Sequence, residues 1–231
     1  ASHIYFGVNK LTGELKHISE VPSGQKCNCI CAACLQPFEA RKGTRRRHHF
    51  AHVSNYECMY ASEVAIYKAF AEALKQSGFL TLPPVMLRFP AWHDPELLQE
   101  ARRLKIDSVA FECEPLSYPP LLRVTMQGTP LRILLDFDRY YDDDDRVELA
   151  EEAKAEDYSI LVISMPKIEQ DTEFTPDRLQ SVLQDNDRTE WVFSRLEEQW
   201  KQKYYAVAVS PPEHGTGNLC PISFGKYKGK Y

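Results

Sequence analysis

The residues best suited to chemistry gather between positions 26 and 58. Five of the seven cysteines and three of the seven histidines of this 231-residue chain lie in that stretch. Thiolate sulfur and imidazole nitrogen are the usual ligands of zinc, so the cluster predicts a metal site. A disulfide framework and a redox pair are the alternatives that the same residue types allow.

The spacing of these residues favours a single zinc ion. Cys31 and Cys34 are separated by two residues, which places two thiolates on one tight turn. A basic segment follows, and then two more ligand positions, so that the predicted ligands are Cys31, Cys34, His52 and Cys58. His49 is the alternative to His52, because either histidine of the segment HHFAH can turn toward the site. Four protein ligands close a tetrahedron, which is typical of a structural zinc ion.

Two further cysteines, Cys27 and Cys29, cannot join the same four-coordinate ion, and we interpret them as part of a strand leading into the site. The competing interpretation of the whole cluster is a set of free buried thiols and core histidines. The opening residues lack a secretory pattern, and no apolar run approaches the ~18 residues of a membrane span. We therefore expect a cytoplasmic protein without membrane contact, a setting in which stable disulfides are rare.

Hydrophobic periodicity predicts an α/β (α+β) fold with a mixed sheet flanked by helices. Residues 62–78 have apolar side chains at helical spacing and end in a glycine, which is typical of an amphipathic helix. Residues 121–128 and 131–138 read as two strands of a hairpin. The other expected elements are a short helix or turn at 95–104, a strand at 104–112, a helix at 144–157, a strand at 158–166, and helices at 176–185 and 190–207.

These elements divide the chain into three expected segments. Residues 1–60 form a β-rich zinc-binding module, residues 61–170 an α/β core, and residues 171–231 C-terminal helices with a basic tail. The module has too little apolar content to fold alone, so we expect metal binding to stabilise it.

The first 70 residues resemble the competence protein CoiA-like family. The motifs that carry the resemblance are the C-x2-C pair, the segment HFAH at 49–52, Cys58, and the helix that begins just before Glu63. That family joins a zinc-ribbon-like module to a PD-(D/E)xK, restriction-endonuclease-like core. The resemblance implies a zinc-containing, nuclease-like protein that binds or processes DNA in competence or phage defence.

The resemblance also implies a carboxylate cluster that would hold Mg²⁺ against a phosphodiester. The candidate carboxylates are Glu63, Asp107, Asp136 and Asp138. The pattern is degenerate, because the family aspartate is missing from residues 118–124 and Tyr67 stands where a histidine is expected. We expect a core that binds without cutting. The alternatives are a non-catalytic scaffold subunit of a DNA-handling or defence complex and an active Mg²⁺-dependent endonuclease.

Charge is segregated along a chain whose net charge is −5. One cluster of five cations lies beside the metal ligands and is the predicted nucleic-acid contact, for DNA rather than RNA: Arg41, Lys42, Arg45, Arg46 and Arg47. A solvated basic loop is the alternative interpretation. Residues 142–157 hold nine acids and two bases, a run that would repel DNA and would suit a basic protein partner.

Overall fold

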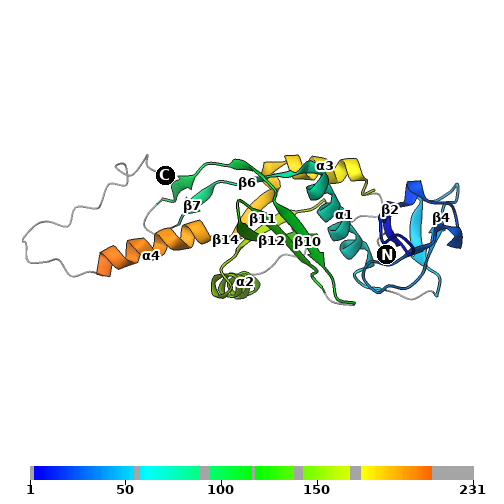
Figure 1. Ribbon diagram of the computed structural model, residues 1–231, viewed down its shortest axis with the longest axis horizontal. Coiled ribbons are helices and arrows are strands. Elements are labelled where there is room, and N and C mark those ends of the chain that lie inside the picture. The colour runs from blue at the N-terminus through cyan, green and yellow to red at the C-terminus, as the bar shows by residue number, and fades with distance from the viewer. Residues whose placement is uncertain are drawn as a thin grey trace, which may run out of the picture.

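A five-stranded sheet forms the centre of the molecule (Figure 1). The computed structural model describes residues 3–54, 58–88, 94–115, 118–137, 143–166 and 173–209. Neighbouring strands are antiparallel except β12 and β13, which are parallel. In sheet order the strands are β10 (Ser108–Glu112), β11 (Leu121–Met126), β12 (Thr129–Asp136), β13 (Ser159–Ser164) and β14 (Thr189–Phe193).

Alternation along the strands gives the sheet one apolar face. The register pairs Leu122 with Ile133 and Val124 with Leu131, and residues directly opposite each other share a face. All four side chains are buried. On the opposite face helix α2 (Asp143–Ala155), which connects β12 to β13, covers a smaller apolar cluster that includes Leu134.

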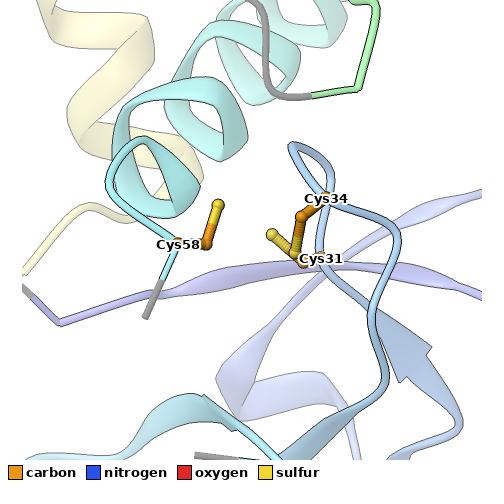
Figure 2. A group of neighbouring side chains, drawn as sticks. All are labelled: Cys31, Cys34 and Cys58. Carbon is orange, nitrogen blue, oxygen red and sulfur yellow. The ribbon is translucent and has the colours of Figure 1, made fainter. Parts of the chain in front are cut away.

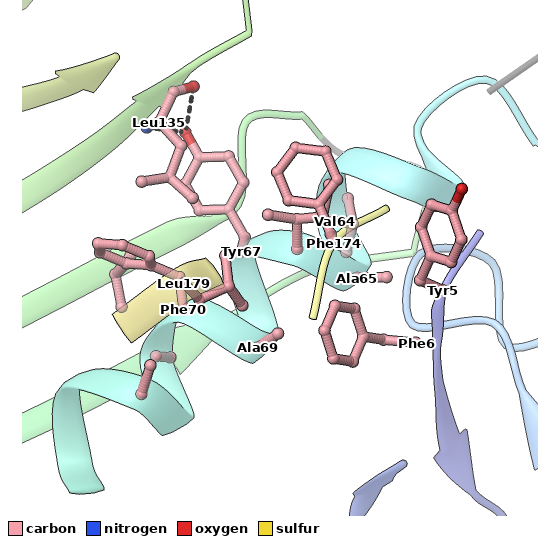
Figure 3. Close-up of a cluster of buried hydrophobic side chains, with 14 of the residues drawn as sticks. Tyr5, Phe6, Val64, Ala65, Tyr67, Ala69, Phe70, Leu135, Phe174 and Leu179 are labelled. Carbon is pink, nitrogen blue, oxygen red and sulfur yellow. Dashed lines mark hydrogen bonds between the residues drawn. The ribbon is translucent and has the colours of Figure 1, made fainter. Parts of the chain in front are cut away.

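Helix α1 (Ala61–Ser77) covers the larger apolar face. It ends at Gly78, whose φ of 65° is the left-handed conformation that glycine adopts without steric cost, and whose N–H donates to the Leu74 carbonyl. The helix is buried on most sides because the N-terminal strands and helix α3 (Pro176–Gln184) also pack against it. Figure 3 shows Phe6, Tyr67, Phe70 and other side chains of this shared core.

The N-terminal part of the chain is built from short strands around α1. Its three-stranded sheet has the order β2–β1–β3, and β4 and β5 form a separate hairpin. Gly7 allows a close approach, since a Cβ there would lie 3.1 Å from the Cys29 Cβ. The elements are β1 (Phe6–Asn9), β2 (Leu15–His17), β3 (Cys29–Ile30), β4 (Phe38–Arg41), β5 (His49–His52) and two 3-10 turns, η1 (Ile18–Glu20) and η2 (Gln25–Cys27).

Two antiparallel ribbons and a terminal helix complete the fold. One ribbon pairs β6 (Phe79–Leu82) with β9 (Arg102–Lys105), and the other pairs β7 (Val85–Leu87) with β8 (Glu96–Gln99). Helix α4 (Arg195–Val209) follows β14 and extends away from the body of the molecule (Figure 1). A buried carboxylate, Glu197, accepts the Arg88 backbone N–H at 3.2 Å and so ties α4 to the residue after β7. A third 3-10 turn, η3 (Asn186–Arg188), precedes β14.

The predicted α/β fold with a mixed sheet is confirmed, and so are the helix after the cysteine cluster and the β11–β12 hairpin. The short helix that was one alternative at 95–104 is wrong, and the other alternative, a turn leading into a strand, is closer. Residues 96–99 and 102–105 form strands, because each pairs with a partner strand in a ribbon. A second helix prediction is also wrong. Residues 189–193 form the edge strand β14, where a helix was expected from residue 190. Among the described residues, no helix has the length and apolar character needed to cross a membrane.

Candidate metal centre

Three cysteines from two segments of the chain lie close together beside the start of α1 (Figure 2). Cys31 and Cys34 lie on the turn between β3 and β4, and Cys58 lies just before α1. Their Sγ atoms are all within 4.8 Å of one another. Zn–S bonds of about 2.3 Å at tetrahedral angles would place sulfur atoms about 3.8 Å apart, so the group needs little adjustment to hold one metal ion.

The structure brings His52, and not His49, to the thiols. The Nε2 atom of His52 lies 3.2 Å from the Sγ atom of Cys34. Side chains alternate along β5, so His52 is on the same buried face as Phe50, and His49 is on the other face. There the Nδ1 atom of His49 donates to the Arg47 carbonyl at 2.9 Å. His52 is therefore the histidine beside Cys34, although among the described residues only the three cysteines have ligand atoms that all lie within 4.8 Å of one another.

Burial keeps the side chains of the cluster uncharged when no metal ion is bound. Burial raises the pKa of Cys31 and of Cys58, and burial lowers the pKa of His52, so all three groups are neutral without a metal ion at neutral pH. The backbone N–H of Ala33 points at the Cys31 sulfur, 3.4 Å away, where it would stabilise a thiolate. A divalent ion would displace the thiol protons and gain three anionic ligands.

The alternatives to a metal site are less well supported by the structure. Every cysteine in the described part of the chain is a free thiol. Cys27 and Cys29 are buried apart from the cluster, and their thiols donate to the carbonyls of Phe38 and Cys27 at 3.4 and 3.2 Å. These two behave as core residues, whereas Cys31, Cys34 and Cys58 face one another as metal ligands do (Figure 2).

Among the described candidate carboxylates, Asp107 lies apart from Asp136. Glu63 is buried in the first turn of α1, and Asp136 lies at the end of β12. Asp107 is at the opposite end of the sheet, where its side chain accepts the Gly128 N–H at 3.0 Å. Asp138 falls outside the described residues. Among the described residues, the three cysteines are the only group of three or more metal-ligating side chains.

Tyr67 occupies the space between α1 and the end of β12. Its hydroxyl accepts the Leu135 N–H at 2.7 Å and lies 3.3 Å from the Leu135 carbonyl, to which it donates (Figure 3). The pairing of β12 with β11 ends at Ile133, two residues before Leu135. The phenol therefore serves as a hydrogen-bond partner for the Leu135 backbone beyond the end of that pairing. The sequence shows Tyr67 only as a departure from the family pattern, and this role of its hydroxyl is visible only in the structure.

The five predicted DNA-contacting cations differ in their surroundings. Lys42 donates to the carbonyls of Ser19 and Val21, and Arg41 pairs with Glu39 at 2.8 Å. Arg47 is 3.8 Å from Glu173. Arg45 and Arg46 lie at exposed positions of the loop between β4 and β5. We call residues 43–48 of this loop the basic loop.

No protein-family model, curated protein or solved structure matches the chain. What the structure shows is a cysteine cluster able to hold a metal ion and a mixed sheet flanked by helices.

Proposed function

We propose that this chain is a nucleic-acid-binding protein whose N-terminal strands are held together by a structural zinc ion. Cys31, Cys34, Cys58 and His52 would bind the ion, with DNA as the preferred ligand of the protein. The observation that carries the proposal is the β4–β5 hairpin. His52, the last residue of β5, lies next to the Cys34 thiol. At the other end of the hairpin, the loop between β4 and β5 exposes Arg45 and Arg46 to solvent.

The zinc ion would hold the β4–β5 hairpin in place and would not take part in a reaction. Four protein ligands leave no open coordination position for a water nucleophile. Fixing the hairpin lowers the entropy lost when its loop meets a phosphate backbone. Each phosphate neutralised by an arginine releases counterions, so binding should weaken as salt is raised.

The resemblance to CoiA-like proteins supports DNA as the ligand, in competence or phage defence, and it raises the possibility of cleavage. We propose a core that binds without hydrolysis. The Tyr67 hydroxyl is bonded to the backbone of Leu135, the residue before Asp136, and Asp107 is at the far end of the sheet. Two-metal or one-metal hydrolysis needs carboxylates gathered at one point.

The first test measures zinc and binding together. Elemental analysis should find about one zinc per chain, as a single tetrahedral site requires. A labelled DNA oligonucleotide should bind in a salt-dependent manner, and Arg45→Ala with Arg46→Ala should weaken it. The matched control is Lys10→Ala with Lys26→Ala, which removes the same charge from exposed positions outside the basic loop, one after β1 and one in η2. Equal loss in both double variants would contradict a specific role for the basic loop.

The second test asks whether the core cuts. Plasmid and single-stranded DNA are incubated with Mg²⁺ or Mn²⁺ and either the parent or Asp136→Ala. We expect no cleavage by either. Metal-dependent cleavage that disappears in Asp136→Ala would replace our proposal with an active endonuclease. If the protein neither binds nor cuts, a protein partner becomes the leading alternative, and the exposed acidic residues of α2 are the surface to test first.

A further inference from the structure

The β6–β9 ribbon has two faces of different character. Its register places Phe79 opposite Lys105, Leu80 opposite Leu104 and Thr81 opposite Arg103. Opposite residues share a face, so Leu80 and Leu104 point together toward the body of the molecule. Leu80 is buried and Leu104 packs against the main core. The outer face consists of Phe79, Thr81, Arg103 and Lys105.

The outer face combines an exposed aromatic ring with two cations. Phe79 is 41% exposed, which is unusual for so large an apolar side chain. The Arg103 guanidinium carbon lies 4.6 Å from the centre of the Phe79 ring, and Arg103 and Lys105 are exposed. The acids that flank β9 in sequence are Glu100 and Asp107, and Asp107 accepts the Gly128 N–H beyond the end of the strand.

Aromatic rings interleaved with cations are the side chains that bind single-stranded nucleic acids. A base stacks on the ring while the cations neutralise phosphates, and the arrangement tolerates any sequence because every base has a π face. We propose that the outer face of the β6–β9 ribbon is a contact surface for single-stranded nucleic acid. The proposal rests on the nucleic-acid binding proposed above and adds a second surface and a preferred strandedness to it.

Helix α1 runs from the cysteine cluster, which lies at one end of the β4–β5 hairpin, to the β6–β9 ribbon. It begins three residues after Cys58 and ends next to Phe79, and its 17 residues span about 25 Å. At the stacked spacing of 3.4 Å per nucleotide, about seven nucleotides cover that distance. A strand shorter than this can reach one surface but not both.

Strand alternation supplies an internal control. Arg102 and Arg103 are adjacent, exposed and equally charged, but Arg102 shares the face of Leu82 and Leu104. Removing either arginine changes the net charge by the same amount. Only Arg103 belongs to the proposed surface.

The experiment measures fluorescence anisotropy of labelled dT20 and dT5 at several salt concentrations, with U20 and a duplex for comparison. Arg103→Ala should weaken dT20 binding and reduce the log–log salt slope by about 0.7, the value for one phosphate on a single strand. Phe79→Leu should weaken binding about 5-fold or more without changing the slope, because stacking releases no counterions. Arg102→Ala should match the parent, and dT5 should bind the parent more weakly than dT20, because it can reach only one of the two surfaces.

Each failure has its own meaning. If Arg102→Ala and Arg103→Ala weaken dT20 equally, diffuse charge explains the effect and the proposed surface is overturned. If the parent binds through Arg45 and Arg46 while Phe79→Leu and Arg103→Ala change nothing, this inference fails and the proposed function stands. If the parent binds none of the four probes, both fail. Circular dichroism of every variant guards against unfolding.

Discussion

The contact between the Nε2 atom of His52 and the Sγ atom of Cys34 distinguishes the two histidines that are candidates for the fourth ligand of the proposed zinc ion. His52 faces Cys34, whereas His49 faces away and donates to the Arg47 carbonyl. We therefore expect His52→Gln to lower zinc affinity by at least the 10-fold typical of a weakened ligand set. His49→Gln should retain zinc. Competition with a chromogenic chelator measures both, and Cys113→Ser, a thiol outside the cluster, is a further control.

Loss of zinc from His49→Gln but not from His52→Gln would reverse this assignment.

The Tyr67 hydroxyl is expected to contribute to stability through one buried backbone group. In Tyr67→Phe the Leu135 N–H loses its 2.7 Å partner inside the core. An unsatisfied buried donor costs about 1–3 kcal/mol, so the free energy of unfolding should fall by that amount in a urea titration. Tyr158→Phe is the control, because that hydroxyl bonds to Glu152 near the surface and its loss should cost less. If both variants lose the same free energy of unfolding, the buried hydrogen bond of Tyr67 contributes no more to stability than the surface hydrogen bond of Tyr158.

At the scale of the element, the turn after Cys34 has an unusual feature. Leu35 has a φ of 62° and its side chain is 56% exposed. The left-handed conformation costs an L-residue about 1–2 kcal/mol, a cost that glycine avoids. We expect Leu35→Gly to leave stability unchanged or to raise it slightly. Leu35→Val should lower the melting temperature, since a β-branched residue tolerates this conformation least.

A melting temperature that falls equally in both variants would mean that the exposed leucine makes a contact that matters more than its backbone.

The elements could be predicted where local and long-range preferences agree. The amphipathic α1 with its glycine cap and the β11–β12 hairpin satisfy both. Residues 95–104 contain Leu, Glu, Gln, Ala and Arg, all good helix formers, but they form β8 and β9 because pairing with β7 and β6 outweighs propensity. β14 differs, because Thr189, Trp191, Val192 and Phe193 are residue types that favour strands, and only their closeness in sequence to helix α4 suggests a helix.

The site shows the same division. The C-x2-C spacing identifies Cys31 and Cys34, because such a turn is a local feature of the sequence, and Cys58 is predicted from its place after the histidines. The choice between His49 and His52 required the strand assignment of residues 49–52, after which alternation alone selects the histidine that shares the face of Phe50. The separation of Asp107 from Asp136 could not be read from the sequence, since it depends on the direction in which each strand enters the sheet.

At the scale of the whole molecule, one hydrophobic core joins the N-terminal strands to the sheet. The cluster runs from Tyr5 and Phe6 through α1 to Leu122 and Ile163. Removing the N-terminal strands would expose one side of α1. The parts therefore share their stability, and we expect one cooperative unfolding transition rather than two.

This shared core makes stability sensitive to pH through His17. Its side chain is 5% exposed, and burial lowers its pKa below the 6.5 of an exposed histidine. The unfolded chain then binds more protons than the folded one as the pH drops below about 6.5, so stability is full above that pH and is lost as the pH falls. The melting temperature of the parent should decrease between pH 7.5 and 5 more steeply than that of His17→Gln.

His48→Gln, at an exposed position, should follow the parent curve. A His17→Gln variant whose melting temperature falls as steeply as that of the parent would assign the acid sensitivity to other groups.

The route of the chain through α1 has a measurable consequence. The Ala61 N–H donates to the Cys58 carbonyl, so the helix starts directly from the cysteine cluster, and Tyr67 of the same helix holds the Leu135 amide in the sheet. If the proposed zinc ion is removed with a chelator, the hydrogen bond from the Leu135 N–H to the Tyr67 hydroxyl should weaken, although it lies far from the thiols. Deuterium uptake at Leu135 would then report on occupancy of the distant cluster, ahead of any global melting.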